Sequence, residues 1–310
     1  MAGANLPAKK YSKKSPTVTR LSFEFDGGST QFIDIAAALS AVNRKFYRAG
    51  CYYYINSVEI YNNETGVVDL HTAPDNWITK NSWNRGFKTF QKMNALVDVP
   101  RPKYHDFKVY LSDLHRTTGT TFPSMHGING TYTAVNLTPD DWDYSQFVSA
   151  DADADPNTQN PDEFYVHLVG DHAGNPNAWN SIGLIQSYAD TRGQPNAEEP
   201  SLPTAARTDP MINLFDFSSE EQLNEIVEHL DLDNESPPYD RNGYVGSSEN
   251  NMQHVARIGT EQGVGRIGRA SGFCAPFGLI CVDPHGVSTA FRVVLNLAVG
   301  TYHGVYAERA

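Results

Sequence analysis

The stretch CYYYINSVEIY, residues 51–61, decides the fold class expected for this chain. In an extended conformation its side chains point alternately to two sides. Apolar residues occupy both sides, with Tyr52, Tyr54, Val58 and Ile60 on one and Tyr53, Ile55 and Tyr61 on the other. A strand with two apolar faces has to be covered on both of them. We therefore expect residues 51–61 to form a central strand of a buried sheet.

Strand patterns recur on both sides of this stretch. VTRLSFEF (18–25) alternates apolar and polar residues, which predicts an edge strand at the start of the ordered fold. Further strand patterns cover residues 66–72, 104–111, 144–150, 163–170, 181–189, 277–282 and 288–302. Between the last two, DPHG (283–286) has the Asp, Pro and Gly positions of a type I turn. That turn predicts a long hairpin that closes the chain.

Helical patterns are fewer and short. They follow Asp34, cover residues 82–93, and begin at a capping box formed by Ser218 and Glu221. Because the strands do not alternate regularly with helices, we expect an all-β fold, an antiparallel jelly-roll sandwich of about eight core strands with short helices inserted in loops. Residues 18–310 would form a single domain with a long loop and helix excursion at about 200–275. A flexible basic arm over residues 1–17 would precede it.

The basic arm contrasts with the rest of the chain. The formal net charge is -12, yet the first twenty residues contain no acidic residue and five basic ones, Lys9, Lys10, Lys13, Lys14 and Arg20. Such an asymmetry indicates contact with nucleic acid or a membrane. A run of about 18 apolar residues, as a membrane span needs, does not occur, so no membrane partner is expected. We therefore predict that these five residues bind phosphates of single-stranded nucleic acid, the alternative being a solvated tail.

The acidic stretch DADADP (151–156) is a candidate metal site. Asp151, Asp153 and Asp155 fall at positions 1, 3 and 5 of a calcium-loop pattern. Position 6 is Pro156 where such a loop needs Gly, and position 12 is Asp162 where it needs Glu. A solvated acidic turn is the alternative. Calcium is the one cofactor considered for this chain, and no other is expected.

Patterns typical of enzymes are missing from the sequence. GVGRIG (263–268) matches a dinucleotide-binding pattern by letter, but it lacks the preceding strand and following helix that phosphate binding requires. The ten histidines include no HExxH pattern, and no G-x-S-x-G elbow occurs. The three cysteines form no even disulfide framework. We expect the protein not to be an enzyme.

Several segments together resemble capsid proteins of small circular single-stranded DNA viruses, mostly environmental or protist-associated lineages. They are the Lys-rich arm, VTRLSFEFDGG (18–28), YYYINSVEIYN (52–62), NSWNRGFKTFQKMN (81–94), YHDFKVYL (104–111) and LPTAARTDPMINLFD (202–216). The resemblance implies a structural jelly-roll protein that assembles into an icosahedral shell of 60 copies or a multiple. Such a shell would enclose a single-stranded DNA genome with the arm facing inward. The protein would then occur in the virion, and in the host cell interior during assembly.

The arm departs from this family in one respect, because it is less rich in Arg than such arms often are. A minimal shell of about 60 copies would supply roughly 300 arm charges against roughly a few thousand phosphates, so other cations would have to contribute. A second hypothesis is a carbohydrate-binding or adhesive β-sandwich module. It rests on the many tyrosines and on Trp77, Trp83, Trp142 and Trp179, together with the Asp-rich loop. A hydrolase on a β scaffold is a third.

Overall fold

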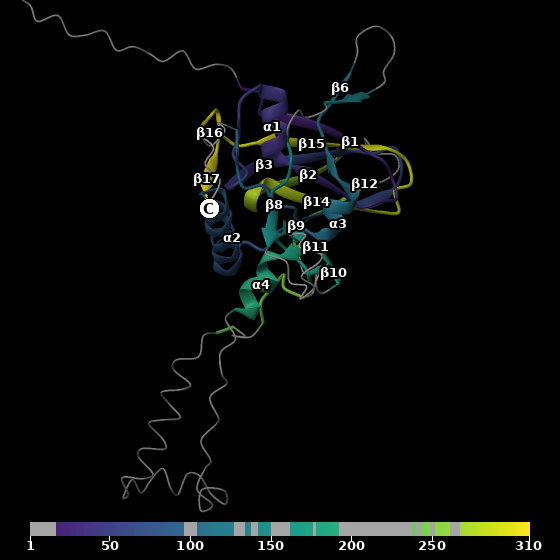
Figure 1. Cartoon of the computed structure of the whole chain (residues 1–310). Coiled ribbons are helices and arrows are strands. Elements are labelled where there is room, and N and C mark those ends of the chain that lie inside the picture. Colours follow the sequence, from purple (N-terminus) through teal and green to yellow (C-terminus); the bar gives the residue numbers. More distant parts are fainter. Residues whose placement is uncertain are drawn as a thin grey trace, which may run out of the picture. The chain divides into compact units, whose positions relative to one another are not determined.

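The computed structural model describes most of the chain (Figure 1). The described residues are 17–95, 104–126, 134–137, 142–149, 162–175, 178–191, 238–239, 243–248, 252–260 and 267–310. The chain divides into two compact units, one made of residues 1–188 and 245–310 and the other of residues 189–244. All described strands belong to the first unit. Of the second unit, the structure describes residues 189–191, 238–239 and 243–244.

The first sheet contains the stretch that indicated the fold class. Its strand order is β1 (Arg20–Phe25), β15 (Phe291–Leu297), β3 (Cys51–Tyr61) and β13 (Ile267–Ala275), and every pair is antiparallel. The short C-terminal strand β17 (Ala307–Arg309) also pairs with the start of β3. The sequence therefore predicted correctly that β3 is central and that β1 lies at an edge.

The second sheet lies opposite the first. Its strand order is β12 (Gln253–Thr260), β4 (Gly66–Thr72), β14 (Leu279–His285) and β2 (Gln31–Asp34), again with antiparallel pairs. A short strand, β5 (Thr120–Thr121), adds to β2 in the parallel direction.

One apolar core fills the space between these two sheets. The first sheet contributes Leu21, Phe23, Phe25, Val58, Ile60, Val293 and Leu295, and the second contributes Ile33, Val68, Leu70, Ile258, Ile280 and Val282. Helix α1 (Ile35–Asn43) follows β2 directly and adds Ile35 and Leu39 to the same cluster. Burial of this alternating apolar surface is the main term that favours folding. The fold is thus an all-β sandwich, as expected.

The predicted closing hairpin is wrong. Strand β14 runs on through Asp283 and Pro284 to His285, and the chain turns only at Gly286, whose φ is 71°. β14 and β15 do not pair with each other, because β14 belongs to the second sheet and β15 to the first. Alternation identified both strands, but it carries no information about which strand each one pairs with.

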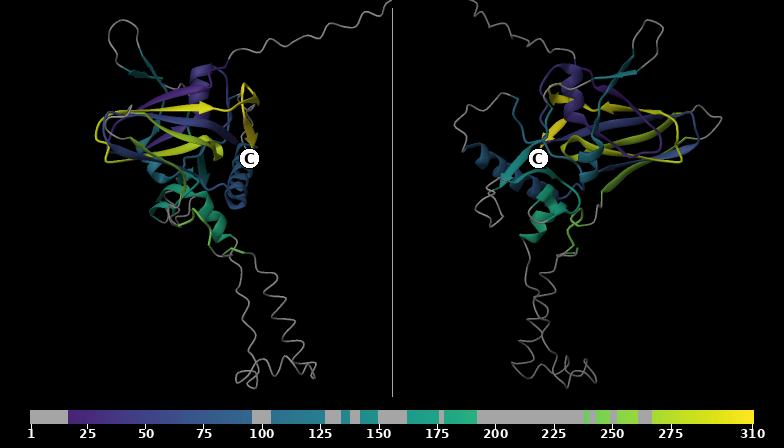
Figure 2. Two further views of the ribbon diagram at one scale, coloured as in Figure 1. Left: turned by 180° about the vertical axis from the view of Figure 1, so that it is seen from behind. Right: turned by 45° about the vertical axis from the view of Figure 1, so that its right-hand side comes forward.

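A long insertion separates β4 from β12. It contains the helices α2 (Trp77–Ala95), α3 (Asp113–Thr118) and α4 (Leu184–Asp190). Four of its strands form a third sheet in the order β10 (Ala173–Asn175), β11 (Ala178–Gly183), β9 (Asp162–His167) and β8 (Gln146–Ser149). Two more, β6 (Ser124–His126) and β7 (Ala134–Asn136), form a separate ribbon that extends away from the sandwich in both views of Figure 2. The strand predicted over 181–189 ends early, because residues from Leu184 onward are helical.

Aromatic packing anchors α2 to the sandwich. Trp83 stacks on Phe277 with ring centroids 5.2 Å apart, and Phe107 packs against Trp83 and Phe90. Phe277 lies in the short 3-10 helix η2 (Pro276–Gly278) with a left-handed φ of 58°, and this conformation precedes β14. The aromatic side chains Trp83 and Phe90 of α2 are therefore core contacts.

The predicted excursion at 200–275 overlaps two core strands. Residues 253–260 form β12 and residues 267–275 form β13, and both pair with strands of the sandwich. β13 contains Gly268 and Gly272 and has few large apolar residues, which is why its sequence resembled a loop. The capping box at Ser218 lies outside the described residues. After β15 the chain ends with β16 (Val299–Tyr302) and β17.

Candidate functional site

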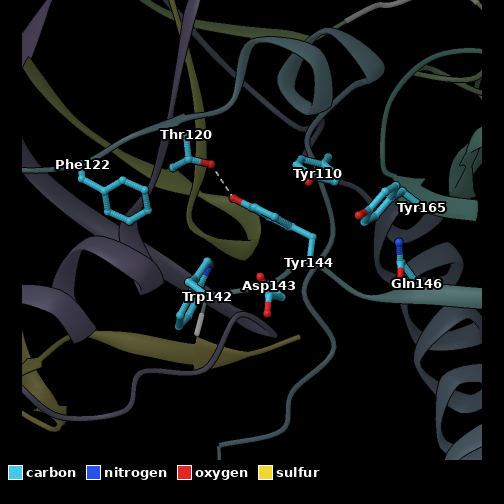
Figure 3. A pocket seen from close by; sticks show the side chains of 8 residues that line it. All are labelled: Tyr110, Thr120, Phe122, Trp142, Asp143, Tyr144, Gln146 and Tyr165. Atoms are coloured by element: carbon cyan, nitrogen blue, oxygen red, sulfur yellow. Dashed lines mark hydrogen bonds between the residues drawn. The ribbon is translucent and has the colours of Figure 1, made fainter. Parts of the chain in front are cut away.

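A pocket of about 400 Å³ opens where the insertion meets the second sheet (Figure 3). Its lining is rich in aromatic side chains and consists of Tyr110, Thr120, Phe122, Trp142, Asp143, Tyr144, Gln146 and Tyr165. These residues come from the segments before and after α3, from the start of β8 with the residues that lead into it, and from β9. The lining residues are spread over positions 110 to 165, so the tertiary fold brings them together.

Backbone hydrogen bonds hold these segments in place. The amide of Tyr110 donates to the carbonyl of Val166 at 3.1 Å, and the amide of Leu168 donates back to the carbonyl of Tyr110 at 2.9 Å. The amide of Ser145 donates to the carbonyl of Lys108 at 2.9 Å. The stretch 104–111, predicted to be a strand, is thus extended but forms only an isolated bridge between Tyr110 and His167.

Four rings pack closely beside the pocket. Tyr110 and Tyr144 stack with centroids 3.9 Å apart, and Tyr165 meets Tyr110 edge to face at 5.7 Å. The buried ring of His115 lies beside this stack and nearly perpendicular to both Tyr110 and Tyr144. The same ring stacks on Phe32 of β2 at 4.7 Å. These contacts fix the tyrosine rings against the second sheet.

A series of hydrogen bonds connects His115 to Asp34 through Thr120 and Tyr144. The amide of Leu111 donates to Nδ1 of His115 at 3.1 Å, so the ring proton lies on Nε2, which donates to Thr120 at 2.8 Å. The hydroxyl of Thr120 then donates to the hydroxyl of Tyr144 at 2.6 Å. Tyr144 donates in turn to Oδ2 of Asp34 at 3.3 Å.

Asp34 is the acceptor at the end of this series. Its Oδ2 also accepts from Nε1 of Trp142 at 3.0 Å, and its Oδ1 accepts from the amide of Ala37 and caps α1. Burial raises the pKa of Asp34 to about 6, although these donors act in the opposite direction. Burial also lowers the pKa of His115 to about 3, so His115 is neutral at physiological pH. The network is suited to holding the pocket rigid.

Of the predicted nucleic-acid residues, Arg20 lies within the described part and Lys9, Lys10, Lys13 and Lys14 lie outside it. Arg20 begins β1, and its side chain is 60% exposed on the outer face of the first sheet. Its guanidinium pairs with Glu59 at 2.9 Å, and Arg269 approaches the same carboxylate at 3.6 Å. A phosphate at Arg20 would therefore compete with Glu59.

The predicted calcium ligands Asp151, Asp153 and Asp155 lie outside the described residues. Within the described ranges, no group of three or more His, Cys, Asp or Glu side chains is arranged to hold a metal ion. Of the four tryptophans, Trp142 lines the pocket, Trp83 is buried in the aromatic anchor of α2, Trp179 is half-buried and Trp77 is exposed.

Sequence reasoning missed a second polar cluster, which lies on the outer face of the second sheet. Asp69 of β4 accepts two hydrogen bonds from Arg257 at 2.8 and 2.7 Å. His254 and His285 approach the same carboxylate at 3.3 and 3.4 Å. Hydrogen bonding to Arg257 lowers the pKa of Asp69 to about 2. The partners come from two strands, β12 and β14. In the sequence, only the polar positions of GVVDLHT within β4 could have indicated that this face of the sheet is an outer face.

Comparison with protein-family models, curated proteins and solved structures finds no match to this chain. Among the helices that the structure describes, none combines the length and apolar character needed to cross a membrane.

Proposed function

We propose that the sandwich is a jelly roll, and the strand order carries this proposal. The eight sandwich strands in chain order are β1, β2, β3, β4, β12, β13, β14 and β15. The first pairs with the eighth, the second with the seventh, the third with the sixth and the fourth with the fifth. Alternate pairs fall in opposite sheets. This is the order of a long antiparallel hairpin rolled into two sheets, as in jelly rolls.

The chain would then be a structural capsid protein that assembles into an icosahedral shell and encloses single-stranded DNA. Jelly rolls are common in virus shells. A Lys-rich arm directly before the first strand fits this role, because flexible lysines can neutralise phosphates without reading bases. The partners would be further copies of the chain and the nucleic acid, and the protein would have no enzymatic role.

Hydrogen bonds at Thr17 and Val18, where the described chain begins, support the division into an arm and a sandwich. The hydroxyl of Thr17 donates to the carbonyl of His303 at 2.9 Å, and the amide of Val18 donates to Asn43 at 2.7 Å. The side chain of Asn43 donates back to the carbonyl of Val18 at 3.0 Å. The sandwich thus holds the chain from Thr17 onward, and the four lysines precede that point.

The purified full chain tests the proposal. Electron microscopy and light scattering at neutral pH should find uniform closed particles far larger than the 34.3 kDa chain. Nucleic acid extracted from the particles should be sensitive to a nuclease that cleaves single-stranded DNA. A monomer at every salt concentration and pH would overturn the proposal and favour the carbohydrate-binding module. Particles that contain only RNA would overturn the assignment of the genome.

A further inference from the structure

Four polar side chains of the pocket have hydrogen-bonding capacity that the described part of the chain does not use. They are the hydroxyls of Tyr110 and Tyr165, the carboxylate of Asp143 and the amide of Gln146. Asp143 and Gln146 are exposed, and both tyrosines are half-buried. Figure 3 shows Gln146 and Tyr165 together on one side of Tyr144, with Asp143 between Trp142 and Tyr144. A ligand with several hydroxyl groups could satisfy these donors and acceptors together.

The charge of the pocket disfavours anionic ligands. Asp143 lines it, and its described lining includes no Lys, Arg or His. The nearby Lys108 is buried, with its ammonium 4.5 Å from the centre of the Trp142 ring, and does not line the pocket. A phosphate, sulfate or carboxylate would lose hydration and face Asp143 without a compensating cation.

The aromatic rings are not arranged as a cage for a cation. Tyr110 and Tyr144 stack on each other, so the two sides of these rings that face each other are occupied, and Lys108 lies over the ring of Trp142. A cation site needs free ring faces. Phe122 differs, because its half-buried ring packs against no other ring within the described residues. Phe122 therefore offers an apolar surface, and Figure 3 shows it on the side of Tyr144 opposite Gln146 and Tyr165.

We propose that this pocket binds a neutral sugar unit of a glycan. The C–H face of the sugar would pack on Phe122, and its hydroxyls would donate to Asp143 and exchange hydrogen bonds with Gln146 and Tyr165. The volume of about 400 Å³ lies within the range of small-molecule sites. Every group belongs to one chain, so the site does not depend on assembly into a shell.

Binding of the full chain to an array of neutral oligosaccharides, with sialylated and sulfated counterparts, tests the site. The strongest neutral ligand is then titrated by calorimetry. We expect Asp143→Ala to weaken binding about tenfold or more, since a hydrogen bond to a charged group is lost. Phe122→Ala should weaken it by a similar factor. Trp77→Ala is the matched control, because Trp77 is an exposed aromatic residue outside the pocket.

Three results would overturn the site. They are the absence of neutral glycan binding at millimolar concentration, binding restricted to anionic glycans, and neutral binding that both pocket variants leave unchanged. Loss of particle assembly in the pocket variants, without an effect on glycan binding, would instead identify another copy of the chain as the occupant. If Phe122→Ala fails to fold, Asp143→Ala still decides the question, because its side chain is exposed.

Discussion

The carboxylate of Asp34 connects two parts of the molecule that are far apart in the sequence. One oxygen caps α1 in the sandwich, and the other accepts from Trp142 and Tyr144 in the insertion. The side chain is fully buried, so ionisation costs free energy that the three donors offset only in part. We therefore expect the ionisation of Asp34 to make the free energy of unfolding depend measurably on pH.

We expect Asp34 to favour folding at acid pH. Its pKa is raised from 3.8 to about 6 on folding, so the folded state binds the proton more tightly than the unfolded state. The contribution is fully present below pH 3.8, is lost as the pH rises through 6, and amounts to roughly 3 kcal/mol. His115 acts with the opposite sign, because its pKa is lowered to about 3 and protonation favours the unfolded state.

Asp34→Asn isolates this contribution. Relative to the wild type, the free energy of unfolding of the variant should rise by roughly 3 kcal/mol between about pH 4 and about pH 7. Urea titrations at the two pH values measure the difference. Asp143→Asn, which changes an exposed carboxylate at the pocket, is the control and should not reproduce it. A difference between wild type and Asp34→Asn that stays constant with pH would contradict the assignment.

Asp69 should contribute to stability with the opposite dependence on pH. Its pKa is lowered to about 2, so its stabilisation is present above 3.8 and is lost as the pH falls through about 2. Because Arg257 is 66% exposed, solvent screens the pair, and Asp69→Asn should cost only about 1 kcal/mol at neutral pH. The cost should vanish near pH 2. Thermal unfolding at both pH values, with Asp283→Asn as the control, measures this, and an equal cost at both would refute it.

At the scale of elements, local patterns predicted which segments are strands and helices but not how they pair. The two apolar faces of residues 51–61 correctly placed β3 inside a sheet, and Asp34 correctly preceded a helix. DPHG has the residues of a turn, yet Asp283, Pro284 and His285 remain in β14 because β4 pairs along this part of the strand. The pocket could not be predicted, since Asp34, Thr120 and Tyr144 meet only through the tertiary fold.

The backbones of β13 and β3 approach each other closely at Gly272. A side chain there would meet the carbonyl oxygen of Ile55 at 2.2 Å and that of Asn56 at 2.6 Å, both backbone atoms. Gly272→Ala should therefore force the two strands apart and cost about 2 kcal/mol. Gly259→Ala in β12 is the matched control, because nothing lies within 4 Å of the added carbon. Equal unfolding free energies for the two variants would show that the strands can adjust.

At the scale of the whole molecule, the insertion occupies the tip of the rolled hairpin. It lies between the fourth and fifth sandwich strands, β4 and β12, and the eight paired strands close without it. Such a tip can vary in length while the core stays the same, because the loop-closure cost grows slowly with length. The described chain begins at Thr17, directly before β1, at the other extreme of this strand order.

The last prediction concerns residues 1–15 of the arm. Its four lysines should bind packaged nucleic acid as mobile point charges without sequence preference. Deleting residues 1–15 keeps Thr17 and Val18, whose hydrogen bonds to His303 and Asn43 hold the chain on the sandwich. The melting temperature and the particles should therefore be unchanged, while copurifying nucleic acid falls.

Deleting residues 1–8 alone is the matched control, because it shortens the chain and keeps all four lysines. The salt dependence of nucleic-acid binding should flatten by up to about four phosphate contacts in the longer deletion only, since each contact releases counterions. Equal packaging and equal slopes in the two deletions would reduce the arm to a solvated tail. If only the longer deletion fails to assemble, the arm belongs to the interface between copies, and nucleic-acid binding must be sought on the outer faces of the sheets.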